Sequence, residues 1–500
     1  MIIKRDRSII CRYFEDNSGV TGSNAEFVAV AENDSDICKF VAEMSKYKMP
    51  VTIAGSLTGN TASGLAFGGC VLSLEKFNKI GEIKELDNNN ALIVVQAGAK
   101  ICDIKSKASK FGWMYPPDPT EQNASIGGNI STNASGGRGF KFGSTRDYVV
   151  ALKVIFSDGS KGYFERGKYF ADNDGKIIFD TDIGKKNIVL PKYFLPVVKN
   201  AAGYYNRFCA DLVDVLIGSE GTLCVIVEAV LKLIPQFKDS FGGIIFFDNF
   251  NKLYKFIYKI KCMSKLSKIN KNINAINAMS LEYFDFNALS IIKNDFPTIP
   301  ENIVAGVMFE QDTYDYSDSD FLIEKWIDVI IDSNVCLEKV WFASNLVQQE
   351  KFRIFRYKIP EHVSKIIRKN NVPKIGTDFA VPENKLLEII DFFDEKFKNI
   401  DVFKLTFGHI GESHLHTNIL ASNKNEYNEC IRICFDIAQK VIDVGGTVSA
   451  EHGIGKLKHF FLKKMLGNEG FFEMSKLKKN FDISGIFGQD NIFPKNYIIS

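Results

Sequence analysis

The stretch SIGGNISTNASGG (residues 125–137) consists mainly of glycine and other small residues, and a similar stretch, AGSLTGNTASG (residues 54–64), overlaps the end of a strand predicted at residues 50–54. Successive backbone N–H groups in such loops can bind phosphate oxygens. Each stretch taken alone is more simply explained as a connector rich in turns. Two of them in one domain favour a large cofactor that carries phosphate.

Several common site motifs are missing from the sequence. Neither stretch has the lysine of a P-loop, and no G-x-G-x-x-G begins a helix, so a Rossmann-type nicotinamide site is not supported. The G-x-S-x-G of many serine hydrolases is also absent. No two of the ten cysteines form a C-x-x-C, which argues against an iron–sulfur centre and favours reduced thiols over a disulfide framework.

The composition is that of an ordinary globular protein with little net charge. The chain has 500 residues, of which 45% are hydrophobic and 24% charged, and its net charge is +2. This balance argues against a protein built to bind nucleic acid. No run of 18 apolar residues predicts a spanning helix, and neither end carries a recognisable sorting signal. We expect a cytoplasmic location, with at most peripheral contact with the inner membrane through the Lys- and Phe-rich residues 252–271, which a solvated helix face explains better.

The glycine content and the pattern of predicted elements change near Pro235. Before it, short strands alternate with helices predicted at residues 34–47 and 101–111, and residues 213–234 read as short strands around a glycine turn. After it, glycine becomes rarer and long helical patterns occupy residues 251–267, 321–332 and 384–398. We expect an α+β protein with segments at residues 1–236, 237–440 and 441–500.

Four of the six histidines lie between residues 409 and 452. Three are in GHIGESHLH (residues 408–416), and His452 is in GGTVSAEHGIG (residues 445–455). The first run predicts a strand, a glycine turn and a second strand, in which His409 and His416 can converge and His414 shares a face with His416. Two imidazoles and a carboxylate such as Glu451 form a common ligand set for a catalytic divalent metal. The alternative is that these are structural histidines in a polar loop.

A series of motifs along the chain resembles the FAD-linked oxidases of the vanillyl-alcohol oxidase/PCMH superfamily. Within it, the sequence is most similar to the D-2-hydroxyacid dehydrogenases, which include D-lactate dehydrogenase, the glycolate oxidase D subunit and D-2-hydroxyglutarate dehydrogenase. Together the matching stretches extend from about residue 11 to residue 493. They are residues 50–59, PPDP (116–119), IGGNISTNASGG (126–137), KFGSTRDY (141–148), IGSEGTL (217–223), DFAVP (378–382), residues 408–416 and residues 446–455.

The resemblance implies a PCMH-type FAD-binding domain of two subdomains, an α+β cap domain that binds substrate, and a C-terminal segment that completes the active site. It also implies that residues 54–60 wrap the pyrophosphate of FAD, that the second glycine-rich stretch lines the ribityl chain and ring, and that IGSEGTL lies near the adenine. The residues expected to contact FAD are Ala54, Gly55, Ser56, Leu57, Thr58, Gly59, Asn60, Asp118, Ile126, Gly127, Gly128, Asn129, Thr132, Asn133, Ala134, Glu220, Gly221 and Ile226.

The resemblance further implies a divalent metal, which is zinc or alternatively manganese or iron. Its ligands would be His409, His416 and Glu451, and His452 corresponds to the catalytic histidine of the family.

Three further residues fall where the family binds its substrate. Arg356 would hold the substrate carboxylate with its planar guanidinium group, unless it forms a surface or interdomain salt bridge. Asn418 matches another substrate-contacting position, and Lys374 is a weaker candidate for the same carboxylate.

Four positions depart from the family pattern. Ala54 and Leu57 stand where the family usually has Arg and Gly, and the bulkier Leu57 can alter the pyrophosphate loop. Glu412 and His414, within GESH (residues 411–414), replace the usual Gly-Asp-Gly-Asn or Gly-Asp-Ser-Asn. The additional imidazole of His414 either changes the choice of metal or simply packs.

We therefore expect oxidation of a D-2-hydroxy acid, of the D-lactate, glycolate or D-2-hydroxyglutarate class, to the 2-oxo acid. His452 would act as general base and hydride would pass to flavin N5. The alternatives are a transferase similar to alkylglycerone-phosphate synthase and a non-catalytic flavoprotein subunit of an electron-transfer complex. The electron acceptor would be a quinone, a cytochrome, an electron-transfer flavoprotein or a separate iron–sulfur subunit, and a homodimer is possible.

Overall fold

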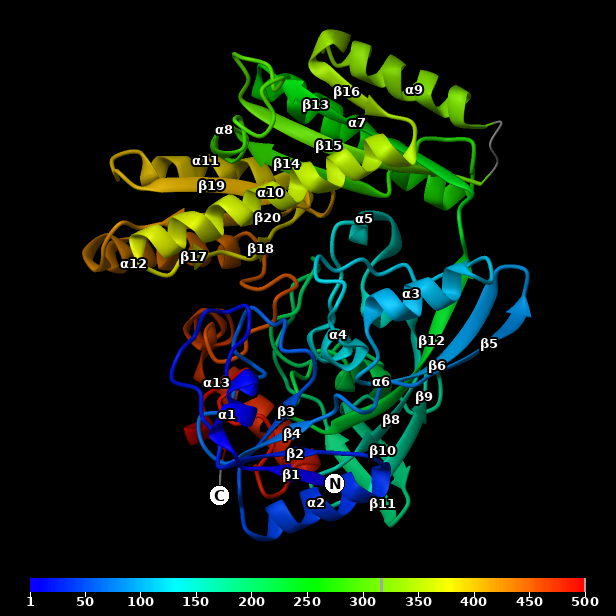
Figure 1. Cartoon of the computed structure of the whole chain (residues 1–500), viewed down its shortest axis with the longest axis vertical. Coiled ribbons are helices and arrows are strands. Elements are labelled where there is room, and N and C mark those ends of the chain that lie inside the picture. The colour runs from blue at the N-terminus through cyan, green and yellow to red at the C-terminus, as the bar shows by residue number, and fades with distance from the viewer. Residues whose placement is uncertain (315–317, 499–500) are drawn as a thin grey trace. The chain divides into compact units, whose positions relative to one another are not determined.

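The computed structural model describes residues 1–314 and 318–498. The chain forms two compact units (Figure 1). The first contains Met1–Gly136, Ser144–Gln236 and Val448–Ser500, and the second contains Gly137–Gly143 and Phe237–Thr447. This division differs in two ways from the segments 1–236, 237–440 and 441–500 expected from the sequence. Residues 137–143 join the second unit, and the chain from Val448 onward joins the first.

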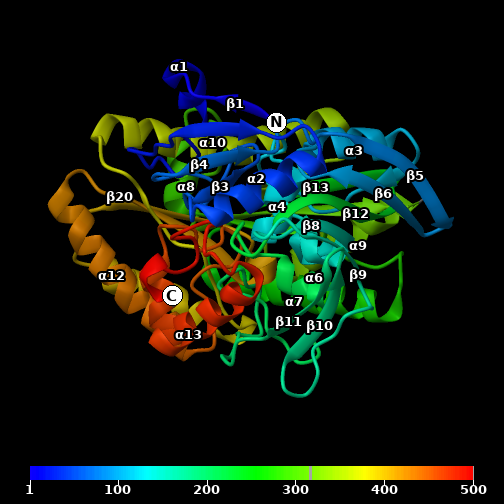
Figure 2. The ribbon, with the colours of Figure 1, turned by 90° about the horizontal axis from the view of Figure 1, so that it is seen from below.

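A four-stranded sheet of the first unit has the order β1 (Ile2–Lys4), β2 (Phe27–Val30), β4 (Cys70–Ser73), β3 (Val51–Ala54). Strands β2, β4 and β3 are parallel. The apolar face of helix α2 (Asp34–Lys46) packs on this sheet, as Figure 2 shows. Ile486 and Phe487 pack into the same core, which explains why the C-terminal part of the chain belongs to this unit.

A second, antiparallel sheet of the first unit has β12 (Val225–Pro235) at its centre. Its order is β5 (Ile80–Asp87), β6 (Asn90–Gln96), β12, β8 (Val149–Ile155), β9 (Lys161–Glu165), and β7 (Trp113–Met114) pairs with the end of β12. Strands β10 (Lys176–Thr181) and β11 (Gly184–Val189) form a separate hairpin. The helices are α1 (Arg7–Ile10), α3 (Ile101–Ser109), α4 (Ile126–Thr132), α6 (Leu212–Leu216) and α13 (His459–Phe481).

Residues 213–234 differ from the short strands predicted for them. The prediction was wrong for α6, because a short apolar run does not distinguish a buried strand from a buried helix. Asp211 caps this helix, and its carboxylate accepts a hydrogen bond from the Val213 N–H at 2.8 Å. Residues 217–224 form the turn after this helix, and residues 225–234 belong to the single long strand β12.

The second unit contains one antiparallel sheet, in which β20 (His414–Leu420) lies beside β19 (Phe403–Gly408). The full order is β16 (Val340–Ala343), β13 (Asp239–Phe247), β15 (Ala305–Thr313), β14 (Ser280–Asp285), β19, β20, β17 (Ile375–Gly376), and β18 (Phe379–Ala380) also pairs with β20. The helices are α5 (Gly139–Phe142), α7 (Phe250–Asn270), α8 (Phe286–Ile291), α9 (Asp318–Asp332), α10 (Leu346–Asn370), α11 (Leu386–Phe397) and α12 (Lys424–Asp443).

Helices cover both faces of this sheet at β13 and β15. On one face Phe246 belongs to a core that includes Phe355 of α10. On the other face Phe309 stacks on Trp326 of α9, with ring centroids 4.0 Å apart, and Trp326 contacts Phe256 of α7. The Lys- and Phe-rich residues 252–271 thus form a helix that contributes to the core.

Most helices predicted from apolar spacing are present. The predictions at residues 34–47, 101–111, 251–267, 321–332 and 384–398 correspond to α2, α3, α7, α9 and α11, with ends that differ by a few residues. Within the part of the chain that the structure describes, no helix has both the length and the hydropathy needed to cross a membrane.

Candidate active site

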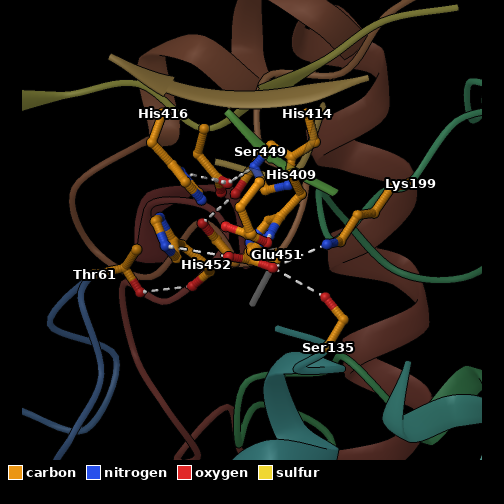
Figure 3. A network of polar contacts seen from close by, with 12 residues as sticks. Thr61, Ser135, Lys199, His409, His414, His416, Ser449, Glu451 and His452 are labelled. Carbon is orange, nitrogen blue, oxygen red and sulfur yellow. Dashed lines mark hydrogen bonds and ion pairs between the residues drawn. The ribbon is translucent and has the colours of Figure 1, made fainter. Parts of the chain in front are cut away.

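Three histidines gather in the second unit where β19 turns into β20. His409 follows β19 directly, and His414 and His416 lie two residues apart on β20, so that the pleat of the strand places both on one face (Figure 3). Their ring centroids are 4.4 Å apart, and the His409 ring lies 5.2 Å from His414 and 5.5 Å from His416. Gly408 permits the turn, because its φ is +133° and a Cβ atom there would lie 3.0 Å from His416 Cδ2. The predicted strand, turn and strand are confirmed.

Glu282 of β14 orients His409. The register of β14 and β19 pairs Tyr283 with Gly408, which brings the preceding Glu282 beside His409. The His409 Nδ1 atom lies 2.6 Å from Glu282 Oε1, and the carboxylate is buried. An ionised carboxylate only accepts hydrogen bonds, so Nδ1 carries the proton and Nε2 carries the lone pair.

Glu282 also contacts the arginine that the sequence analysis expects at the substrate. The Arg356 Nε atom of α10 lies 3.2 Å from Glu282 Oε2, and the arginine side chain is 20% exposed. One buried carboxylate therefore links His409 to Arg356.

Asp378 orients His414 as Glu282 orients His409. Both side chains are fully buried, and His414 Nε2 donates a hydrogen bond of 2.8 Å to Asp378 Oδ1. His416 Nδ1 lies 3.8 Å from the same oxygen. Strand β18, which follows Asp378, pairs with β20 through Ala380 and His414, and this pairing places the carboxylate at the imidazoles.

The chemistry of these groups fits a divalent cation. One ligand atom from each of His409, His414 and His416 lies within 4.8 Å of the others. Histidines that bind metals commonly donate their second ring N–H to a carboxylate, which fixes the tautomer, as Glu282 and Asp378 do here. Neutral imidazoles of fixed tautomer suit zinc, iron, nickel or copper.

Two other predicted substrate contacts belong to the same unit. Asn418 is buried and follows His416 by two residues, so it shares the face of β20 that carries the histidines. Lys374 precedes β17 and is exposed.

Glu451 and His452 belong to the first unit. The Glu451 Oε2 atom accepts a hydrogen bond of 2.9 Å from Ser135 Oγ and lies 3.0 Å from Lys199 Nζ (Figure 3). His452 Nε2 lies 3.9 Å from Glu451 Oε1, and the His452 carbonyl accepts a hydrogen bond from Thr61 Oγ1 at 3.4 Å. These contacts bring both residues to the first unit's own glycine-rich stretches.

Glu220 anchors the chain immediately after His452. Its buried carboxylate accepts hydrogen bonds from the backbone N–H groups of Ile454 (2.8 Å) and Gly455 (2.7 Å). Burial raises the pKa of Glu220 to about 7, and the two N–H donors oppose that rise in part. The carboxylate of Glu220, which the family resemblance places near the adenine, thus accepts hydrogen bonds from the protein's own backbone. Of its expected neighbours, Gly221 has a φ of +68° and Ile226 is buried in β12.

The two glycine-rich stretches lie against each other. The Ser125 hydroxyl accepts hydrogen bonds from the backbone N–H groups of Ser56 and Gly128, both at 3.4 Å. A Cβ atom on Gly55 would lie only 2.2 Å from Ser125 Oγ, so this contact requires glycine. Leu57 has a φ of +54°, a left-handed conformation that costs a residue with a Cβ atom roughly 1–2 kcal/mol.

Asn129 offers a test of whether these stretches fit a flavin nucleotide. Its Nδ2 atom is buried and has no hydrogen-bond acceptor among residues 1–314 and 318–498. Buried amide donors are normally paired, and the oxygens of FAD are suitable acceptors, so the residues present fit the cofactor.

The remaining residues expected at FAD lie nearby in the same unit. Thr132 Oγ1 donates to the Gly128 carbonyl at 3.1 Å, and Asn133 Oδ1 accepts from the Arg146 N–H at 3.0 Å. Asp118 accepts hydrogen bonds from Lys105 and, at 3.1 Å, from Gln122 Nε2. Ala54, Thr58, Gly59, Asn60, Ile126, Gly127 and Ala134 lie on the two stretches themselves.

Four residues of these networks were not predicted. Asp378 and Ser135 lie within motifs that matched the family, so a search of those motifs for polar residues could have found them. Glu282 and Lys199 lie in stretches without a motif. The pairing of β14 with β19 brings Glu282 to the histidines. The course of the chain before α6 brings Lys199 to Glu451.

Two family models match the chain. The model "FAD binding domain" matches residues 25–161, which include both glycine-rich stretches. The model "FAD linked oxidases, C-terminal domain" matches residues 261–492, which include the histidine cluster, Glu451 and His452.

Several curated proteins are similar over most of their length. Glycolate oxidase subunit GlcD of Bacillus subtilis is 27% identical over 482 residues, which cover 95% of this chain and 90% of that protein. A D-lactate dehydrogenase of Anaerostipes hadrus is 27% identical, with 94% and 90% covered. A D-2-hydroxyglutarate dehydrogenase of Stutzerimonas stutzeri is 26% identical, with 89% and 86% covered.

A solved structure shows the same fold. Alkyldihydroxyacetonephosphate synthase matches with a TM-score of 0.63 at 15% identity, covering 97% of this chain and 81% of that one. The expected mixed α+β architecture, a PCMH-type FAD-binding domain with a second α+β domain, is confirmed. From the two matched models and the distant relatives that share the full arrangement, we conclude that the chain belongs to the FAD-linked oxidases.

Proposed function

We propose that the protein is an FAD-dependent dehydrogenase that oxidises a D-2-hydroxy acid of the D-lactate, glycolate or D-2-hydroxyglutarate class to the 2-oxo acid. The observation that carries this proposal is the cluster of His409, His414 and His416, in which buried carboxylates fix two of the rings. The names of the relatives, glycolate oxidase subunit and D-lactate dehydrogenase, support the substrate class.

The proposal includes two bound groups. When bound, FAD accepts the hydride, and a divalent metal lowers the pKa of a hydroxyl that coordinates it. The proposed metal ligands are those that the resemblance to the family implies, His409, His416 and Glu451. The proposed FAD-binding residues are those of the two glycine-rich stretches, with the buried Asn129 amide as one donor.

The protein's own residues would bind the substrate and move its proton. Arg356 would bind the substrate carboxylate, because its planar guanidinium group can donate two parallel hydrogen bonds to a carboxylate. Asn418 would donate a hydrogen bond to the substrate from the same face of β20 as His416. His452 would take the proton of the substrate hydroxyl as general base. Lys374, exposed before β17, is the weakest of these candidates.

The electrons would leave to a quinone, a cytochrome, an electron-transfer flavoprotein or an iron–sulfur subunit.

An anaerobic absorbance experiment tests the proposal. The purified protein, reconstituted with FAD and Zn²⁺, is mixed with D- and L-2-hydroxy acids, with and without prior treatment with a chelator. We expect the flavin bands to bleach with a D-acid, and the bleaching to be lost after chelation. Flavin that no hydroxy acid reduces would contradict the proposal and favour the transferase or the non-catalytic subunit. A protein that binds no FAD would contradict all three.

A further inference from the structure

We propose that His414 is a third imidazole ligand, which makes the metal centre of this chain a three-histidine site that prefers Zn²⁺ to Mn²⁺. This inference rests on the proposed function only in placing a divalent cation at the histidine cluster. It changes the expected ligand set, in which His409 and His416 are the only imidazoles.

The position of His414 in the sequence is the first observation. It occupies the last position of the GESH turn and precedes His416 by two residues on β20, so both rings leave the strand on the same face. The sequence therefore places a third imidazole beside His409 and His416.

The geometry of the cluster is the second observation. The His414 ring centroid lies 4.4 Å from that of His416 and 5.2 Å from that of His409. One ligand atom of each ring lies within 4.8 Å of the others. Zinc–nitrogen bonds are about 2.0–2.1 Å long, so the three rings would move closer together when they bind one ion.

The hydrogen bond from His414 to Asp378 is the third observation. Because the carboxylate accepts the proton-bearing Nε2, the lone pair of His414 is on Nδ1. In His409 the two nitrogens exchange these roles. Nδ1 donates to Glu282, and Nε2 carries the lone pair. Each ring thus combines a carboxylate on one nitrogen with a lone pair on the other, which is the usual arrangement of a histidine that binds a metal.

Charge supplies the fourth observation. Glu282 and Asp378 are both buried, and a buried carboxylate requires nearby positive charge or several hydrogen bonds. Arg356 supplies a cation to Glu282, and His414 and His416 lie beside Asp378. A divalent ion held by these imidazoles would place positive charge next to Asp378.

The ligand chemistry determines the metal preference. Manganese prefers oxygen ligands, whereas imidazole suits zinc and the other late first-row metals, for which nitrogen sites also have higher intrinsic affinity. A third imidazole in place of an oxygen ligand should therefore move the preference of the site toward Zn²⁺. The usual asparagine at this position would offer an amide oxygen instead.

Metal titration of the full-length FAD-loaded protein tests the inference without measuring turnover. Co²⁺ is used as a spectroscopic probe of zinc sites, and Zn²⁺ and Mn²⁺ affinities are measured by chelator competition. The variants are His414→Asn, which restores the residue usual in the family, and His362→Asn as a matched control. His362 is also a histidine of the second unit paired with a carboxylate, Asp295, at 2.7 Å.

We expect His414→Asn to weaken Zn²⁺ binding by at least the roughly 10- to 100-fold that is usual for loss of a residue behind a metal-binding histidine, to weaken Mn²⁺ binding less, and to shift the visible bands of bound Co²⁺. His362→Asn should bind all three ions like the wild type. Wild-type affinity and an unchanged Co²⁺ spectrum in His414→Asn would overturn the inference, and so would a wild-type protein that binds no ion. Thermal melting of the metal-free variants identifies any loss of folding, and His414→Gln is the second variant if His414→Asn does not fold.

The result also separates this inference from the proposed function. Three-imidazole binding in a protein whose flavin no hydroxy acid reduces would retain the inference and reject the proposed function. Reduction of the flavin that depends on metal but is accompanied by wild-type Zn²⁺ affinity in His414→Asn would do the reverse.

Discussion

The buried carboxylates beside the histidine cluster and the one beside the chain after His452 have different surroundings. In the second unit, Glu282 and Asp378 face the ring nitrogens of His409 and His414. In the first unit, Glu220 faces the backbone N–H groups of Ile454 and Gly455. The second unit therefore builds its site from side chains whose identity matters. The first builds its glycine-rich stretches from backbone, where the size of the residue matters more than its chemistry.

His452 is the sharpest exception to this contrast, because it is a side chain of the first unit for which we propose a chemical role. His452→Ala should reduce the rate of flavin reduction by about 10²- to 10⁴-fold, the usual contribution of a general base, while bound FAD remains. Stopped-flow absorbance with a reducing D-acid measures the rate, and the flavin spectrum measures the FAD. A variant with a near-normal rate would show that another group takes the proton.

The pH dependence of stability tests how burial among backbone N–H groups affects the pKa of Glu220. Burial raises its pKa from 4.5 to about 7 in the folded protein. Between these values the folded state binds more protons than the unfolded state, so the free energy of unfolding falls as pH rises from about 4.5 to about 7, by about 3 kcal/mol in total.

Urea denaturation at several pH values measures this loss of stability. Glu220→Gln has no titrating proton and should show a shallower fall than the wild type. Asp285, whose pKa burial also raises to about 7, provides a second contribution of the same sign, which Asp285→Asn should remove. An identical pH dependence in the wild type and Glu220→Gln would contradict the raised pKa.

Glu282 tests the claim that side-chain identity matters in the second unit. Glu282→Gln keeps the size of the side chain but removes the charge that fixes the proton of His409 on Nδ1 and contacts Arg356. We expect metal affinity to fall by about 10- to 100-fold, as is usual for a residue behind a metal-binding histidine. Isothermal titration with Zn²⁺ measures it. Glu310→Gln, which removes a half-buried partner of Arg138, is the matched control, and an equal loss in both variants would argue against a specific role.

Two glycines test the claim that size matters in the first unit. A Cβ atom on Gly55 would lie 2.2 Å from Ser125 Oγ, whereas on Gly59 the nearest heavy atom would be 3.8 Å away. Gly55→Ala should therefore lower the stability of the FAD-free protein by about 1 kcal/mol or more, while Gly59→Ala should change the stability of the FAD-free protein little. Thermal melting of the FAD-free variants compares the two. Equal effects of both substitutions would show that the contact with Ser125 does not constrain this loop.

Local patterns in the sequence predicted several parts of the fold correctly. The spacing of Ile37, Phe40, Val41 and Met44 predicted α2, because one helical face must be apolar to pack on a sheet. The run from residue 403 to residue 416 predicted two strands joined by a glycine turn. Helix α6 was not predicted, because its five residues are too few to show a period.

The sequence by itself determined the family, the two glycine-rich stretches and the close spacing of His409, His414 and His416, since each of these depends on residues near one another in the chain. The tertiary structure alone decided that Glu282 and Asp378 orient the histidines, that Ser125 joins the two glycine-rich stretches, and that Glu220 binds the backbone beyond His452. These contacts join residues that are up to 235 positions apart, as Gly455 and Glu220 are. Strand register and core packing set such distances, and no local pattern of residue types records them.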